Sequence, residues 1–166
     1  MKTNISALMN LIAQEEKILN NKSYSLVAYA KNTSVEELDG RVNIIEDFKE
    51  EFDLNFAEVE RITKELSNLK TILYTKNNEF KLSDGRTIQQ AIVDNTYLRK
   101  LKTTYEQLLV FQNSKKRVTE VNNSYFECKT VNFNSNEIRT MIEKIDKQIQ
   151  KTDFEISKLN SIEFEI

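Results

Sequence analysis

Residues 34–76 decide the expected fold, and they read SVEELDG RVNIIEDFKE EFDLNFAEVE RITKELSNLK TILYTK. The segment opens with a capping box, in which Ser34 and Glu37 would each satisfy a free backbone N–H. Apolar side chains then follow the alternating intervals of four and three residues of a heptad, with Lys49, Thr63 and Lys70 in the remaining positions. They are Leu38, Val42, Ile45, Phe52, Phe56, Val59, Leu66 and Leu73. This heptad spacing predicts one helix over 35–76, roughly 60 Å long at 1.5 Å per residue.

The apolar stripe of this helix is wider than the seam of a two-stranded coiled coil. Ile44, Phe48, Ile62 and Leu69 lie beside the heptad positions. A stripe of that width is typical of a helix that packs against more than one neighbour. Gly40 would cost about 1 kcal/mol inside the helix, and it indicates a bend or a close contact.

Three further helices and two strands are expected in the rest of the chain. Apolar residues at helical spacing predict helices over residues 5–20, 88–121 and 136–160. Aromatic and β-branched residues predict a strand over 24–30, and alternation predicts its partner over 125–133. The fold class is therefore mainly α: a long antiparallel helical hairpin or bundle of four helices with a small two-stranded β element, forming a single domain over 1–166.

A turn separates the two halves of the chain. Asp84 and Gly85 form a strong turn signal, and Arg86 follows them. Thr87 with Gln90 makes a second capping box at the start of the next helix. The order helix-strand-helix on either side of this turn suggests a structural two-fold.

Charge favours pairing of the second and third helices. Residues 46–65 hold eight acids and three bases, whereas residues 99–118 hold six bases and one acid. If the chain folds back near residue 82, residue i lies beside residue 164 − i, and the two blocks meet. The blocks would select the register more than they stabilise it, because exposed ion pairs contribute about 0–1 kcal/mol each. Lys115, Lys116 and Arg117 would then be a neutralised or solvated helix face.

Composition excludes several kinds of chemistry. The chain has no His, no Pro, one Cys and two Gly, with a net charge of −2. Without His, the commonest general base and metal ligand is absent. One Cys cannot form an internal disulfide, and Cys128 is expected to be a small buried hydrophobe. We expect no cofactor, no metal and no enzymatic activity, and neither a signal peptide nor a membrane span is evident, so a cytoplasmic protein is expected.

Two groups of residues stand out as candidate sites. The polar cluster Ser83–Thr87 could mimic a catalytic site, but turn and cap formation account for Asp84, Gly85, Arg86 and Thr87. Aromatic residues are enriched at interfaces, which makes those of the predicted strands and of the long helix interface candidates. They are Tyr24, Tyr29, Phe48, Phe52, Phe56, Tyr125, Phe126 and Phe133.

The stretch Leu82-Ser83-Asp84-Gly85-Arg86-Thr87-Ile88, continued by Ala91, Ile92, Leu98 and Arg99, resembles the central motif of the septicolysin-like proteins, a bacterial family of small helical proteins. The resemblance extends to Leu26-Val27 with Ala30 and to the Tyr125–Val131 segment. The chain departs from the family pattern in being rich in Lys and Asn and in its longer second helix. The family name implies an oxygen-labile cytolysin, for which Cys128 would be the thiol, and no catalytic residues carry over.

The leading functional hypothesis is a non-enzymatic structural or scaffold protein that forms homo-oligomers. A helix too long to be covered by its own chain would leave apolar surface for other copies. One alternative is the membrane-active, cytolysin-like protein that the resemblance implies, with amphipathic helices that leave the bundle. Another is a nucleic-acid or phage-component adaptor that uses the basic end of the third helix.

Overall fold

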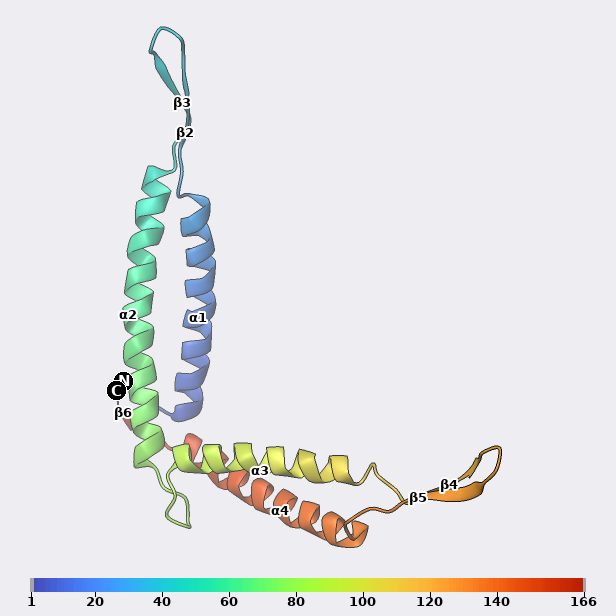
Figure 1. The fold of residues 1–166 in the computed structure, drawn as a ribbon. Helices are drawn as coiled ribbons and strands as arrows, with labels where there is room; N and C mark the ends of the chain where they lie inside the picture. The colour runs from blue at the N-terminus through green and yellow to red at the C-terminus, as the bar shows by residue number, and fades with distance from the viewer. Residues whose placement is uncertain (1, 166) are drawn as a thin grey trace. The chain divides into compact units, whose positions relative to one another are not determined.

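The computed structural model describes residues 2–165, which are mainly helical (Figure 1). The described elements, in chain order, are β1 (Lys2–Thr3), α1 (Ile5–Ala28), β2 (Thr33–Glu36), β3 (Val42–Glu46), α2 (Lys49–Glu79), α3 (Ile88–Leu108), β4 (Ser114–Thr119), β5 (Ser124–Lys129), α4 (Ser135–Asn160) and β6 (Phe164–Glu165). The chain divides into two compact units, one made of residues 1–77 with 160–166 and the other of residues 78–159.

The first unit is an antiparallel pair of helices, α1 and α2, joined by the β2–β3 hairpin (Figure 1). Asn4 caps α1, because its side-chain oxygen accepts from the Ala7 N–H at 2.8 Å. The core between the helices consists of Leu8, Ile12, Ile62, Leu66 and Leu69. The short strands β1 and β6 pair antiparallel, and Phe164 of β6 packs against this core.

The second unit repeats that order: α3 and α4 lie side by side, joined by the β4–β5 hairpin (Figure 1). Thr87 and Gln90 form the predicted capping box at the start of α3. Ile88 and Ala91 of α3 are buried, as are Ile138, Ile145 and Ile149 of α4. Each half of the chain is thus helix, β-hairpin, helix, where the sequence predicted helix, strand, helix.

The predicted helix over 35–76 is wrong at its N-terminal end. Residues 33–46 form the β2–β3 hairpin, and α2 begins only at Lys49. Gly40 has a φ of +85° at the tip of this hairpin, a backbone conformation that a helix interior does not contain. The Ser34–Glu37 capping box therefore does not form, and both residues lie in or beside β2.

Of the two predicted strands, the one over 125–133 is confirmed for residues 125–129 as part of β5, whereas the strand over 24–30 and the pairing of the two are wrong. Residues 24–28 belong to α1, which extends past residue 20, and β5 pairs with β4 over Ser114–Thr119. The third helix ends at Leu108 and not near residue 121. Local pairing across a short loop loses less chain entropy than pairing of segments about a hundred residues apart. The last helix, predicted over 136–160, is confirmed as Ser135–Asn160.

The partners of the helices differ from those expected from charge. Lys70 of α2 pairs with Glu16 of α1 at 2.6 Å. Lys102 of α3 pairs with Asp146 of α4 at 2.7 Å. Within each unit the apolar stripes meet and ion pairs form at their edges, since burial of apolar surface contributes more than exposed ion pairs do.

Candidate functional site

The turn before α3 is a closed, internally bonded loop. The N–H of Leu82 donates to the Arg86 carbonyl at 2.8 Å, and the N–H of Gly85 donates to the Leu82 carbonyl at 3.0 Å. Gly85 takes a φ of +89°, which favours glycine. Asp84 accepts from the backbone N–H of Arg86 at 3.0 Å. The Asp-Gly-Arg sequence thus sets one conformation of this loop.

Arg86 joins the turn to both helices of its unit. Its guanidinium pairs with Asp84 and with Asp94, each at 2.7 Å, and reaches the Thr152 hydroxyl at 3.4 Å. Hydrogen bonds from Arg86 hold the pKa of Asp84 below its ordinary value, and the two carboxylates raise the pKa of Arg86. Arg86 is therefore a permanent cation, and its position serves to fix the turn.

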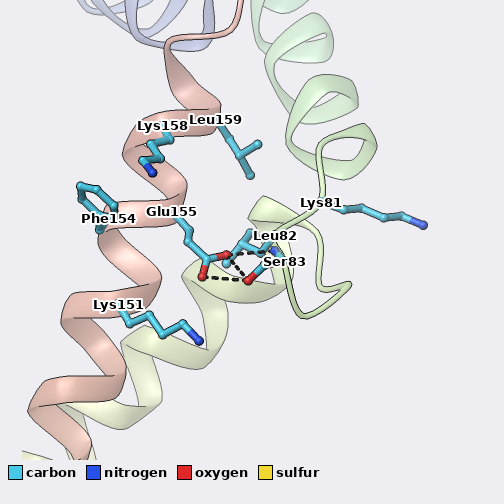
Figure 2. A pocket seen from close by; sticks show the side chains of 8 residues that line it. All are labelled: Lys81, Leu82, Ser83, Lys151, Phe154, Glu155, Lys158 and Leu159. Carbon is cyan, nitrogen blue, oxygen red and sulfur yellow. Dashed lines mark hydrogen bonds between the residues drawn. The ribbon is translucent and has the colours of Figure 1, made fainter.

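The turn and α4 enclose an open groove of about 490 Å³ (Figure 2). Its lining residues are Lys81, Leu82, Ser83, Lys151, Phe154, Glu155, Lys158 and Leu159. Glu155 points toward Ser83, whereas Lys81 points away from them (Figure 2). The groove brings a hydroxyl and a carboxylate together, an arrangement that resembles a catalytic pair.

The contacts of Glu155 argue for anchoring and against catalysis. Its carboxylate accepts from the Ser83 N–H at 2.9 Å and from the Ser83 hydroxyl at 2.9 and 2.8 Å. The backbone N–H, then the hydroxyl, lowers the pKa of Glu155 below its ordinary value. A carboxylate with a lowered pKa is a weaker base than an ordinary glutamate, which is less favourable for activating the hydroxyl. The pair holds the turn on α4.

Polar contacts also cross the seam between α3 and α4. Asn95 is 1% exposed, and its side-chain N–H groups donate to Asp153 at 2.8 Å and to the Ile149 carbonyl at 3.5 Å. Arg99 pairs with the same Asp153 at 2.7 Å. The side-chain oxygen of Asn95 has no hydrogen-bond partner within residues 2–165. These contacts fix the register of the two helices.

The two tyrosines expected on a strand over 24–30 lie instead on helix α1 and at its C-terminal end. Tyr24 is exposed on α1, and Tyr29 caps that helix. Tyr29 lies 5.1 Å from Phe48, measured between ring centroids, and Phe52 lies 6.0 Å from Phe56 on α2. Four of the five rings therefore form two pairs beside the base of the β2–β3 hairpin.

The other candidates lie in the second unit. Tyr125 and Phe126 are exposed neighbours on β5, and Phe133 is half-buried just before α4. The ammonium of Lys115 lies 4.5 Å from the centre of the Phe126 ring. Lys115, Lys116 and Arg117 belong to strand β4, so their predicted place on a helix face is wrong. Cys128 is exposed on β5, which corrects the expectation that it is buried.

Sequence reasoning missed the two hairpins as projecting elements. Every residue of β2, β3 and β5 is exposed, and β4 has one half-buried residue. Each tip carries a fully exposed aliphatic side chain, Leu38 in the first hairpin and Val121 in the second. The sequence did contain a turn signal for the β2–β3 hairpin, because Asp39-Gly40-Arg41 repeats the tripeptide that predicted the turn at residues 84–86.

An asparagine closes the base of each hairpin. Asn32 stands just before β2, and its oxygen accepts from the Phe48 N–H at 2.8 Å. Asn113 stands just before β4, and its oxygen accepts from the Val131 N–H at 2.8 Å. In both cases the acceptor precedes the first strand and the donor lies two residues past the second. The same kind of hydrogen bond thus closes both hairpins at the base.

Residues 2–165 contain neither a metal-binding cluster nor a membrane-spanning helix. No three side chains among His, Cys, Asp and Glu gather closely enough to hold a metal ion. No helix combines the length and the apolar character needed to cross a membrane. The features that remain are an anchored turn, a polar helix seam and two exposed hairpins.

The fold defines a class of helical protein in which each antiparallel helix pair is extended by a β-hairpin. The chain belongs to DUF6847, a family of unknown function, whose model matches residues 41–163. A functionally unknown conserved protein from Corynebacterium diphtheriae, solved by crystallography, has a similar fold, with a TM-score of 0.65 and 18% sequence identity. The match covers 99% of this chain and 100% of that one. No curated protein matches the chain.

Proposed function

We propose that this protein is a non-enzymatic structural protein that self-associates, with copies of the chain covering one another's hairpins. One observation carries the proposal: both hairpins are exposed along their length and still carry apolar side chains. A lone two-stranded hairpin is at best marginally stable in water. Two such hairpins on one chain, each presenting free strand edges, favour a partner that covers them.

The energetics indicate how much surface must be covered. In the two strands of the β2–β3 hairpin, the aliphatic side chains are between 47% and 65% exposed; they are Val35, Val42, Ile44 and Ile45. Full burial of such a side chain is worth about 1.5–3 kcal/mol, so covering the exposed half of each gives roughly 4 kcal/mol in all. Association costs about 4–15 kcal/mol. One hairpin alone therefore barely offsets association, and the interface must include both hairpins.

The native mass tests the proposal. Light scattering coupled to size exclusion, over a hundredfold range of concentration, should give a multiple of the 19.5 kDa chain mass. Ile44→Asn should shift the protein toward monomer, because it places an amide in the covered surface. Val93→Asn, at an exposed position of α3, is the matched control and should keep the wild-type mass. A wild-type monomer at every concentration would refute self-association.

A membrane-active protein is the second candidate, implied by the septicolysin resemblance. The observation in its favour is the fully exposed pair of tip residues, Leu38 and Val121. Aliphatic residues at the tips of projecting hairpins could enter the outer part of a bilayer. Dye release from phosphatidylcholine vesicles, with and without anionic lipid, tests this. Release by the wild type that is lost in Leu38→Asp with Val121→Asp would support it, and no release would dismiss it.

A further inference from the structure

We infer that the β2–β3 hairpin of one copy docks on the β4–β5 hairpin of a second copy, which rests on the proposed self-association and assigns its interface. The inference is based on the opposite net charges of two exposed hairpins that have similar structures. Each hairpin has unpaired strand edges, an aliphatic tip and an asparagine at its base. Together they supply four strands, a number that is stable where two are not.

The β2–β3 hairpin is acidic. Residues 33–46 contain four carboxylates and one Arg, a net charge of −3. Arg41 is engaged by Asp39 at 2.7 Å, whereas Glu36 and Glu37 form no ion pair within residues 2–165. Glu36 lies opposite Val42, and Ser34 lies opposite Ile44, so these four share one face. That face offers a carboxylate beside two aliphatic side chains.

The β4–β5 hairpin is basic. Residues 114–129 contain four cations and two carboxylates, a net charge of +2. Lys115 lies opposite Cys128, and Arg117 lies opposite Phe126, so one face carries two cations, an aromatic ring and no acid. Arg117 forms no ion pair within the described part of the chain. This face offers cations to the carboxylates of the acidic hairpin and an aromatic ring to its aliphatic side chains.

Charge decides between this pairing and its rivals. Two β2–β3 hairpins would bring net charges of −3 and −3 together, and two β4–β5 hairpins would bring +2 and +2 together. Like charges across an interface cost several kcal/mol, and opposite charges set partner and register. A nucleic acid would be attracted to the basic hairpin but repelled by the acidic one and by a chain of net charge −2. A second copy satisfies both hairpins.

Each copy carries both halves of this contact. Two copies can exchange them reciprocally to close a two-fold dimer, or successive copies can extend the contact into a ring. Either assembly leaves no hairpin of its members uncovered. Because ions screen exposed charges beyond about 10 Å at 0.1 M salt, the association should weaken as salt is added.

Charge reversal tests the inference. One variant carries Glu36→Lys with Glu37→Lys, so both of its hairpins are basic. A second carries Lys115→Glu with Arg117→Glu, so both of its hairpins are acidic. Each alone should associate about tenfold or more weakly than the wild type. An equimolar mixture of the two, and a chain carrying all four substitutions, should recover association.

Controls separate interface effects from loss of structure. Glu143→Lys and Lys147→Glu reverse exposed charges on α4 and should keep the wild-type mass. Far-UV circular dichroism should show wild-type helix content in every variant, because all substituted side chains are exposed.

The outcomes distinguish the inference from the proposed function. If the wild type is an oligomer that both charge-reversed variants match, the inference is overturned and self-association stands. A monomeric wild type overturns both. If the mixture and the fourfold variant stay dissociated, complementarity between the hairpins is overturned. Binding of a single-stranded oligonucleotide that is lost in Lys115→Glu with Arg117→Glu, with oligomer mass unchanged, would assign the basic hairpin to nucleic acid instead.

Discussion

At the scale of single residues, the contact between Ser83 and Glu155 should make stability depend on pH. The pKa of Glu155 is lowered from 4.5 by hydrogen bonds from Ser83. A carboxyl whose pKa is lower in the folded state stabilises the fold above its unfolded pKa, and this contribution is lost as pH falls through the folded pKa. Asp84, whose pKa Arg86 lowers, acts in the same direction. The helix pair α3–α4 should therefore weaken under acid.

The variant Glu155→Gln tests this pH dependence. It should melt below the wild type near pH 7, because a neutral amide accepts more weakly from the Ser83 groups. The difference should shrink as pH falls from about 4.5, the ordinary value of the unfolded group, through the lower pKa of the folded Glu155, below which the wild-type carboxyl is also neutral. Thermal melts from about pH 7 to about pH 3 would measure it, with exposed Glu143→Gln as control. A difference that is constant over this range would contradict an ionised Glu155 as the acceptor.

The tripeptide Asp-Gly-Arg, which occurs twice, shows how far the sequence predicts structure at this scale. Asp84-Gly85-Arg86 predicted its turn, and the same tripeptide at residues 39–41 makes an equivalent one. In both, the Asp carboxylate accepts from the backbone N–H and the guanidinium of the Arg two residues on. The first copy was misassigned because it lies within an apolar heptad pattern. The asparagines at the hairpin bases could not be predicted, because their partners lie 16 and 18 residues away.

At the scale of elements, the errors share one physical origin. Val42 and Ile45 fit a helical period, while Val42 and Ile44 fit the two-residue period of a strand, so periodicity alone does not separate the two over so few residues. Gly40 breaks the tie, since a φ of +85° costs a glycine little and would strain any other residue. Residues 24–28, by contrast, are rich in strand-forming types yet continue α1, because β propensity depends strongly on context and does not by itself make a strand.

The α3–α4 seam carries a prediction at the same scale. Asn95 is almost fully buried with an unpaired oxygen, and such an orphan costs about 1–3 kcal/mol. Asn95→Leu removes the orphan with little change in volume, so the free energy of unfolding should change by less than about 1 kcal/mol. Asn95→Asp places a buried carboxylate beside Asp153, and it should lower the free energy of unfolding by about 2–3 kcal/mol.

Urea unfolding followed by circular dichroism would measure both variants. Acidification should relieve part of the cost of Asn95→Asp, because protonation removes the repulsion between the two carboxyls. A loss for Asn95→Leu well above about 1 kcal/mol would show that the hydrogen bond of Asn95 to Asp153 matters more than the unpaired oxygen.

At the scale of the whole molecule, the sequence predicted a mainly helical chain with small two-stranded β structure, but not the partners of its elements. The charge blocks at 46–65 and 99–118 suggested that α2 pairs with α3. In the structure each helix meets the neighbour to which a hairpin connects it, as Lys70 with Glu16 and Lys102 with Asp146 show. Exposed charges are too weak to override apolar stripes within a unit, and they remain available to select partners between molecules.

Amide hydrogen exchange offers the test at this scale. If copies cover one another's hairpins, amides of β2, β3, β4 and β5 should be protected at high protein concentration and should exchange far faster on dilution to monomer, because lone hairpins open readily. Amides in the cores of α1 to α4 should stay protected at both concentrations, since Leu8, Ile62 and Ile88 are buried within their own units. Hairpin exchange that is equally fast at every concentration would mean that nothing covers these strands, and equally slow exchange would mean that they need no second copy.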